Sequence, residues 1–369
     1  MSTFEEEYSD TIEIQYKLIL SALCNLDTAH AAVAAERILH QFESKLNAGK
    51  QFNHSNPPTT ETYNNIITCW VNSGKGFYPH RYKPSFQHSS HPPANILAEM
   101  IHLYKQNLSR VRPDRISFNM VIGSLSQHQR RELLTASDHE LKQIKQLAFD
   151  FVQEMLDFYK KGHDTCAPDM VVFSTVLNMY LRGAPDPEDA NRACKLLDEM
   201  LELNSLDSYV HDVRPSARLF NVVLGLMADQ NRVDETTLTN ARRYIEIMEE
   251  LAENEVPRSM DVDHYLESLT PHPSQPEDNS SFTSSKPDGV TYNSLIKIAS
   301  NALMPEIAQE ILDDMIQRYT AGDDSVKPNI ITFNTVSAFL SLSICFMLLQ
   351  SRNLHLISLC LQPGAACMV

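Results

Sequence analysis

Side chains able to do metal or nucleophilic chemistry are scattered through this chain rather than gathered into a motif. His80, His88 and His91 lie close together, but in a Pro-rich stretch without cysteine or carboxylate partners, which offers no defined metal geometry. The paired acids at 249–250 and 313–314 fall on the exposed flanks of periodic apolar segments, as solvated helix faces do. No G-x-x-x-x-G-K, H-E-x-x-H or G-x-S-x-G occurs. The sequence therefore predicts no enzyme, no metal site and no cofactor.

A different set of residues recurs in a fixed pattern. Each copy reads Pro, three variable residues, usually Ser or Thr, an aromatic residue, usually Asn, and then an apolar run. The copies begin at Pro58, Pro113, Pro168, Pro215, Pro287 and Pro328. Six copies of one pattern predict a repeat protein.

Each copy predicts the start of a helix. Pro blocks continuation of the preceding helix, and the Asp or Ser after it can cap the new one by accepting a free backbone N–H. The aromatic residues form one buried stripe with apolar residues three and four positions later: Tyr63, Phe118, Phe173, Phe220, Tyr292 and Phe333. A second helix follows each start and ends near Met100, Met155, Met200, Met248 and Met315. Each unit is thus a helical hairpin, and the expected fold is all-α, an α-solenoid of stacked antiparallel helix pairs.

The units are longer than a simple hairpin because they contain inserts at 74–93, 126–144 and 271–286, which we expect to be loops between helices. The chain divides into an acidic tail at 1–10, a degenerate first hairpin at 11–57, helical repeats with inserted loops at 58–270, a disordered Pro/Ser-rich linker at 271–286, further repeats at 287–340 with the last one truncated, and an atypical apolar tail at 341–369. We interpret the tail as a truncated or misread end of a longer array; a membrane helix is the alternative.

The formal net charge of −16 has the wrong sign for a protein that attracts polyanions through its overall field. A solenoid has separate faces, however, and only one of them must be neutral or basic to bind a polyanion. The seven cysteines are odd in number and form no C-x-x-C pair, which fits a reducing compartment. The acidic start MSTFEEEYSD has neither a signal core nor the character of a transit peptide.

The Pro-Asp-x-x-Thr-Tyr-Asn start, with a second helix ending in acidic residues and Met, resembles the pentatricopeptide repeat family from about residue 11 to 340. The W-x-x-L-G-x-x-Y helix of tetratricopeptide repeats is absent. The resemblance implies a non-enzymatic protein that binds single-stranded RNA, one base per repeat, in RNA processing, stability or translation. It also implies a mitochondrion or plastid, although no transit peptide is visible and cytoplasm or nucleus stays open.

In that family two side chains read each base: the residue after the helix-A aromatic and the residue after the next Pro. The resemblance implies the pairs Asn64 with Asp114, Asn119 with Asp169, Ser174 with Ser216, Asn293 with Asn329, and Asn221 with either Asp288 or Arg258, while Asn334 is the reader of the truncated unit. Short amides and hydroxyls suit this role because they offer a donor and an acceptor to a base edge. Beside these readers, the resemblance implies base-stacking residues at Ile116, Val171, Val290 and Ile331, with Glu61 and Arg218 as departures. Together these pairs imply a pyrimidine-rich target.

Several of the first helices end in a cation, which predicts a phosphate track formed by Lys75, Arg130, Arg182 and Arg232. A cation also stabilises a helix C-terminus anywhere, so this role is not unique. Two alternatives stay open: a helical scaffold that binds proteins, which the negative charge and the inserts favour, and the RNA-binding part of a truncated RNA-processing enzyme. A protein effector is a possible partner, whereas no small-molecule substrate and no membrane is expected.

Overall fold

The computed structural model describes residues 18–26, 28–47, 57–74, 89–183, 186–205, 213–230, 233–254 and 284–337. Within these ranges the regular elements are helices and no strand occurs, as expected for the all-α class. The α-helices that lie wholly within the described residues are α2 (Ala29–Asn47), α3 (Thr60–Asn72), α4 (Pro92–Lys105), α5 (Arg115–Glu132), α6 (Asp138–Lys160), α7 (Met170–Tyr180), α8 (Pro187–Ser205), α9 (Ala217–Ala228), α10 (Glu235–Glu253), α12 (Gly289–Asn301) and α13 (Pro305–Thr320). Residues 18–24 and 330–337 are helical as well. Single 3₁₀ turns at Ser109–Val111, Asp164–Cys166 and Asp324–Val326 each end two residues before a repeat Pro.

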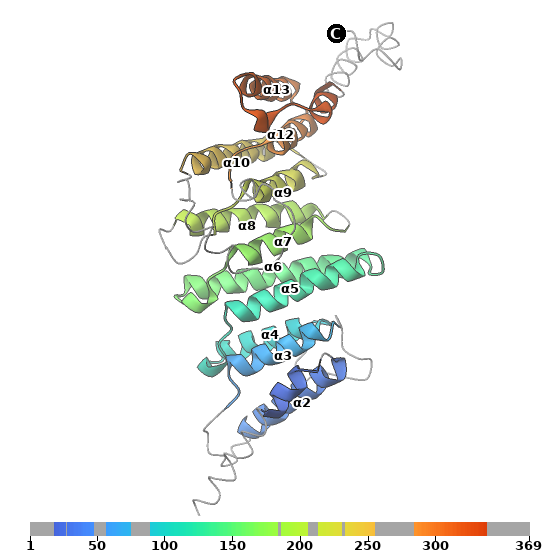
Figure 1. The fold of residues 1–369 in the computed structure, drawn as a ribbon, viewed down its shortest axis with the longest axis vertical. Helices are drawn as coiled ribbons and strands as arrows, with labels where there is room; N and C mark the ends of the chain where they lie inside the picture. Colours follow the sequence, from blue (N-terminus) through green and yellow to red (C-terminus); the bar gives the residue numbers. More distant parts are fainter. Residues whose placement is uncertain are drawn as a thin grey trace, which may run out of the picture. The chain divides into compact units, whose positions relative to one another are not determined.

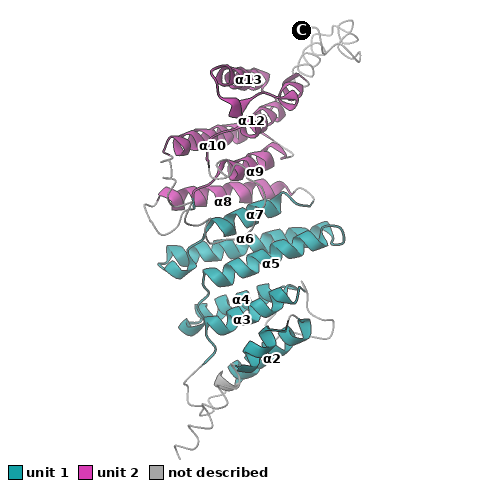
Figure 2. Cartoon of the chain, viewed as in Figure 1, with its two compact units in different colours: residues 1–184, 207–213 teal, residues 185–206, 214–369 magenta. Residues whose placement is uncertain are grey.

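The chain forms two compact units, residues 1–184 with 207–213 and residues 185–206 with 214–369 (Figure 2). We call the helix that follows each repeat Pro an A helix (α3, α5, α7, α9, α12) and the next helix along the chain a B helix (α4, α6, α8, α10, α13). In the first unit, α3 pairs with α4 and α5 with α6, and the A helices α3, α5 and α7 pack in succession (Figure 1). In the second unit, α9 pairs with α10, α12 with α13, and α9 packs against α12. The expected solenoid class of stacked helix pairs is confirmed.

The helix starts follow the chemistry of the residue after each Pro. The carboxylates of Asp114, Asp169 and Asp288 accept the backbone N–H of the third helical residue at 2.9–3.0 Å. Each bond satisfies a donor that the first turn of a helix leaves free, and a negative charge at this end is favoured by the helix dipole. The expected caps are therefore present at these three starts.

The predicted core is also present. Tyr63, Phe118, Phe173, Phe220 and Tyr292 are at most 3% exposed, and the methionines that end the B-helix patterns are fully buried. Phe333 differs because 49% of it is exposed. The residues that follow it, from 338 onward, lie outside the described part, together with the apolar tail at 341–369. None of the described helices is long and apolar enough to span a bilayer.

The insert at 126–144 is helical rather than a loop. It extends α5 to Glu132 and α6 back to Asp138, with a short turn between them. Ser137 and Glu140 form a reciprocal capping box that starts α6. The sequence around it, rich in Gln, Arg, Glu and Leu, consists of good helix formers, which is why the insert lengthens both helices. Most of the other two inserts lies outside the described residues, but Ser284 and Ser285 contact Ala217 and Pro215.

A buried polar cluster joins α2 to the first complete hairpin. The indole N–H of Trp70 donates to Glu36 at 2.9 Å, and His40 lies 3.7 Å from Glu36 and 3.4 Å from Glu99. Burial disfavours the charged imidazole, but the two carboxylates outweigh it and raise the pKa of His40 to about 9. The degenerate first hairpin is thus held by a charged histidine between two buried carboxylates.

Candidate nucleic-acid interface

At some of the repeats, the residue after the helix-A aromatic contacts the residue after the next repeat Pro. In three cases the asparagine amide donates to the aspartate carboxylate: Asn64 to Asp114 at 3.2 Å, Asn119 to Asp169 at 2.9 Å, and Asn221 to Asp288 at 3.0 Å. We call these contacts the reader pairs, after the base-reading role that the family resemblance leads us to expect of them. The partners stand 50 to 67 residues apart in sequence, so stacking of successive A helices brings them together.

Asn221 contacts Asp288, one of the two partners that the sequence left open. Its amide bonds to Asp288, whereas Arg258 lies outside the described residues. Ser174 and Ser216 belong to different units. The Ser174 hydroxyl donates to the carbonyl of Val171, and Ser216 is the N-cap residue of α9. Asn334 is exposed.

A hydroxyl group donates to the amide oxygen of three of the expected reader asparagines. Ser117 donates to the amide oxygen of Asn64 at 2.6 Å, Thr291 to that of Asn221 at 2.7 Å, and Thr332 to that of Asn293 at 2.6 Å. Each hydroxyl also accepts the backbone N–H of the cap residue of its own helix: Asp114, Asp288 or Asn329. This Ser or Thr belongs to the repeat pattern, and its place in the capping box is the signal in the sequence that could have identified it as a functional residue.

Asn119 lacks this second contact. Val172 occupies the position of the hydroxyl, and α7 is capped by Asp169 alone. Among the described residues, the buried amide oxygen of Asn119 has no hydrogen-bond partner. A buried acceptor left without a donor costs about 1–3 kcal/mol.

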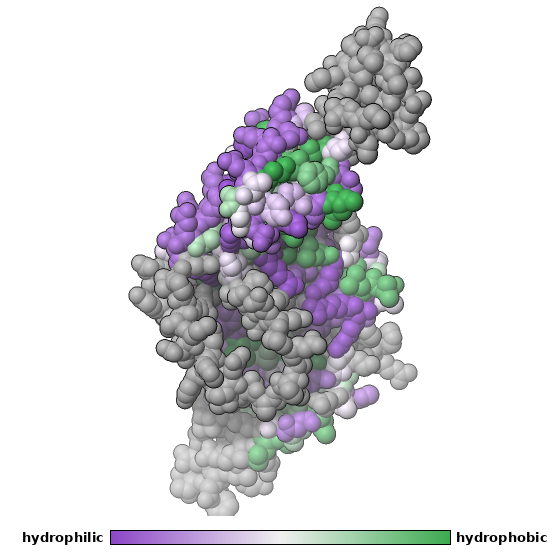
Figure 3. Space-filling view, turned by 45° about the horizontal axis from the view of Figure 1, so that its top comes forward, coloured by the Kyte–Doolittle hydropathy of each residue, from purple (hydrophilic) through white to green (hydrophobic). Residues whose placement is uncertain are grey.

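Exposed branched apolar side chains stand in the first turn of the same helices. Ile116, Val171, Val290 and Ile331 are 57–61% exposed. Glu61 and Arg218, at the same position in two other repeats, are exposed as well. On the face drawn in Figure 3, apolar residues form small patches among hydrophilic ones. An apolar side chain beside a polar pair matches the flat face and the polar edge of a nucleobase.

The C-terminal ends of the A helices in the first unit carry cations. Arg182 donates to the Ser126 hydroxyl at 3.1 Å, and Arg131 donates to the carbonyl of Gly74 at 2.7 Å. Burial, and then the nearby charge of Arg130, lower the pKa of Arg182. Arg130 itself is exposed. Arg130, Arg131 and Arg182 are therefore neighbours.

The remaining predicted phosphate contacts, Lys75 and Arg232, lie outside the described residues. In the second unit, Lys297 of α12 is paired with Asp229, which follows α9. Of the four predicted phosphate contacts, the structure therefore describes Arg130 and Arg182, both in the first unit.

Charge is divided unevenly between the two kinds of helix. The A helices carry five Arg or Lys residues and two Glu, whereas the B helices carry nine Arg or Lys and twenty Asp or Glu. When the capping residues Asp114, Asp169 and Asp288 are included, the net charge of the A helices is zero. The excess negative charge of the described helices therefore belongs to the B helices.

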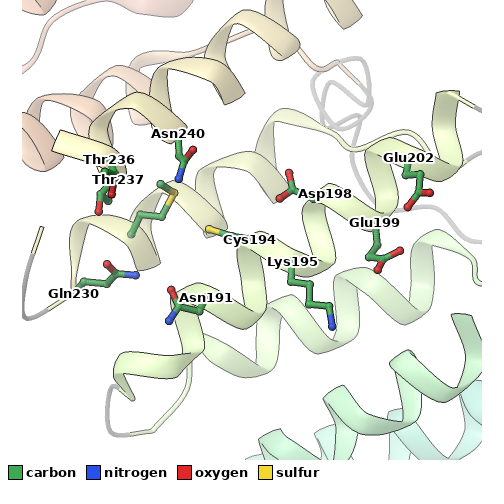
Figure 4. Close-up of a pocket in the computed structure, with 11 residues that line it drawn as sticks. Asn191, Cys194, Lys195, Asp198, Glu199, Glu202, Gln230, Thr236, Thr237 and Asn240 are labelled. Atoms are coloured by element: carbon green, nitrogen blue, oxygen red, sulfur yellow. The ribbon is translucent and has the colours of Figure 1, made fainter. Parts of the chain in front are cut away.

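A polar pocket of about 460 Å³ opens between α8 and α10 (Figure 4). Burial raises the pKa of the Cys194 thiol in its lining to about 11, so the thiol is protonated at neutral pH. Asp198 is held by Arg243 and the Tyr244 hydroxyl. These two lining residues therefore offer no activated nucleophile, and the described residues contain no cluster of three metal-ligating side chains.

The pentatricopeptide repeat domain model matches residues 283–339. Comparison with curated proteins gave no match. Similar solved structures include crystal structures of the pentatricopeptide repeat protein PPR10, and of a variant with three cysteines replaced by serine, in complex with an 18-nt psaJ RNA element. Each is 14% identical with a TM-score of 0.16, and the alignment covers 95% of this chain and 58% of the PPR10 chain. Residues 283–339 thus match the pentatricopeptide repeat domain, and the helix start found in this segment recurs six times along the chain.

Proposed function

We propose that this chain binds single-stranded RNA, with one base held at each hairpin by a reader pair and its neighbouring branched apolar residue. The observation that carries this proposal is the repetition of one site. Ile116 and Val290, each about 60% exposed, stand in the first turn after the cap residues Asp114 and Asp288 of two reader pairs. One such arrangement could occur on the surface of any protein. Because the arrangement recurs in both units, we expect a ligand that itself repeats, such as a nucleic-acid strand.

The chemistry of the reader pair suits a pyrimidine. The aspartate carboxylate takes one hydrogen of the asparagine amide and leaves the other hydrogen and an oxygen lone pair for a base edge. Following the family's pattern, the Asn–Asp pairs are expected to select uracil, and Asn293 with Asn329 to select cytosine. The base would stack on the branched side chain, as bases do on flat or apolar platforms in other single-strand binders.

Electrostatics limits how the RNA is bound. The A helices with their capping residues carry no net charge, and the B helices are acidic. Long-range attraction of RNA is therefore weak, and affinity depends on direct contacts at the A helices. The arginines at the ends of α5 and α7 would contact phosphates, which makes binding dependent on salt. The biological role that fits is occupation of a single-stranded transcript segment in RNA processing, stability or translation.

The test is binding of the full chain to short labelled RNAs, followed by fluorescence anisotropy at several salt concentrations. We expect uridine-rich single strands to bind more tightly than adenosine-rich ones, and hairpin RNA to bind less than either. Changing Asn64, Asn119 and Asn221 together to Ala should abolish the base preference without unfolding the chain. Equal binding to all sequences by the unchanged protein would contradict base reading.

A protein-binding scaffold is the second candidate, and the acidic B helices favour it. Its partner would be a basic protein that contacts α8, α10 and α13. Absence of binding to any single-stranded RNA would make this the leading function.

A further inference from the structure

The three hydroxyls that contact reader amides have no assigned role in base recognition. We propose that the hydroxyl one residue before the aromatic of each hairpin is a positioning group for the reader amide of the preceding hairpin, and that Val172 in its place makes Asn119 less selective between uracil and cytosine. The inference rests on the proposed function, because selectivity has meaning only if RNA is bound.

An amide has two orientations, related by a half-turn, that exchange its oxygen and its nitrogen. Uracil presents a donor between two acceptors along its pairing edge, while cytosine presents a donor followed by two acceptors. An amide that turns freely can match either base. Discrimination therefore requires that the amide be held in one orientation.

The second unit contains a reader held at both ends. The carboxylate of Asp288 accepts from the amide nitrogen of Asn221 at 3.0 Å, and the hydroxyl of Thr291 donates to its oxygen at 2.7 Å. The hydroxyl oxygen accepts the backbone N–H of Asp288 at 3.0 Å, so its one hydrogen is available to donate. A carboxylate oxygen of Asp288 also lies 3.0 Å from this hydroxyl, but it already accepts from Asn221 and from the N–H of Thr291. We therefore assign the hydroxyl proton of Thr291 to the shorter contact, the one with the amide oxygen of Asn221.

The first unit contains both versions of the site. Ser117 closes the same arrangement around Asn64, with 2.6 Å to the amide oxygen and 3.2 Å between the amide nitrogen and Asp114. At Asn119 the carboxylate contact is present, but Val172 is buried where the hydroxyl would be. This amide is held at one end, and its buried oxygen has no partner in the described part of the chain.

A purely structural role for the hydroxyl is the competing explanation. Ser117 and Thr291 belong to capping boxes, and a capping box stabilises a helix with or without RNA. Stability therefore does not distinguish the two explanations. The ratio of affinities for two RNAs that differ only at one base does, because a change in helix stability alters both affinities equally.

The experiment compares Thr291→Val, which removes the hydroxyl at Asn221, with Val172→Thr, which supplies it at Asn119. Val and Thr have nearly the same shape, so each variant is the control for the other. Binding of the full chain is measured to a panel of RNAs in which each position in turn is uracil or cytosine, and thermal unfolding is recorded for each variant.

We expect Thr291→Val to reduce the uracil-to-cytosine affinity ratio about fivefold, the scale of one hydrogen bond, at one position only. Val172→Thr should increase the ratio by a similar factor at a different position, two nucleotides to the 5′ side. Ratios that stay unchanged while the RNA remains bound would overturn this proposal and leave RNA binding intact. If the unchanged protein binds no single strand, the proposed function fails and this inference fails with it.

Discussion

The amide of Asn119 and the carboxylate of Asp169 stand 50 residues apart in sequence and 2.9 Å apart in space. The same carboxylate accepts the backbone N–H of Val172 at 3.0 Å and so starts α7. One side chain thus caps its own helix and holds the reader of the hairpin before it. Because Asp114 and Asp288 do the same, helix initiation and the geometry of the candidate site are coupled at these three helix starts.

Val172→Thr should stabilise the first unit, although replacing a buried Val by Thr normally destabilises. The new hydroxyl would satisfy the buried oxygen of Asn119 and accept the N–H of Asp169, which is worth about 1 kcal/mol. Urea unfolding followed by circular dichroism measures the difference. Val176→Thr, in the same helix and also fully buried, is the matched control and should destabilise by about 1 kcal/mol or more. Equal destabilisation by both variants would contradict the assigned role of Val172.

Asp169→Asn should change base preference with little loss of stability. Asn caps helices about as well as Asp, so α7 should still form. The pair then resembles Asn293 with Asn329, and the preferred base at that position should move from uracil toward cytosine. Competition binding with RNAs that differ at this one base is the measurement; a preference that stays on uracil would show that the carboxylate does not contribute.

Charge reversal at Arg182 should weaken RNA binding by a similar factor for every sequence. A phosphate contact does not depend on base identity, so its loss weakens binding to all sequences alike. The slope of log affinity against log salt concentration should decrease in magnitude by about 1. Lys105→Glu, on the B helix α4 of the same unit, is the control and should leave affinity within about twofold. An effect of Arg182→Glu that is confined to one RNA sequence would rule out a phosphate contact.

The stability of the first unit should fall as pH rises above neutrality. His40 has a folded pKa of about 9 against an ordinary value of 6.5, so its stabilising charge is fully present below pH 6.5 and is lost as pH rises through 9. The loss is on the order of 1–3 kcal/mol, and His40→Gln should flatten this part of the pH profile. Burial lowers the pKa of His91 to about 3. This histidine therefore affects stability at lower pH, because the folded state loses stability as pH falls below 6.5. Denaturant unfolding between pH 6 and 10 separates the two.

The sequence by itself determined the hairpins and their starts, because these depend on neighbours a few residues away. Pro113 and Asp114 specify where α5 begins, and Phe118 with the apolar residues after it specifies the buried side. The pairing of Asn119 with Asp169 was expected only through the resemblance to pentatricopeptide repeats, and the two side chains are in contact.

Only the tertiary structure decided the features that depend on which groups meet across hairpins. The sequence left Asn221 with two possible partners, and the packing of α9 against α12 brings it to Asp288, 67 residues away. The capping box on Ser137 shows that the expected loop at 126–144 continues both helices, since helix propensity and packing prevailed over the spacing of the repeats. The unsatisfied oxygen of Asn119 beside Val172 is invisible in a pattern of residue types, because hydrogen-bond satisfaction is a property of atoms in contact.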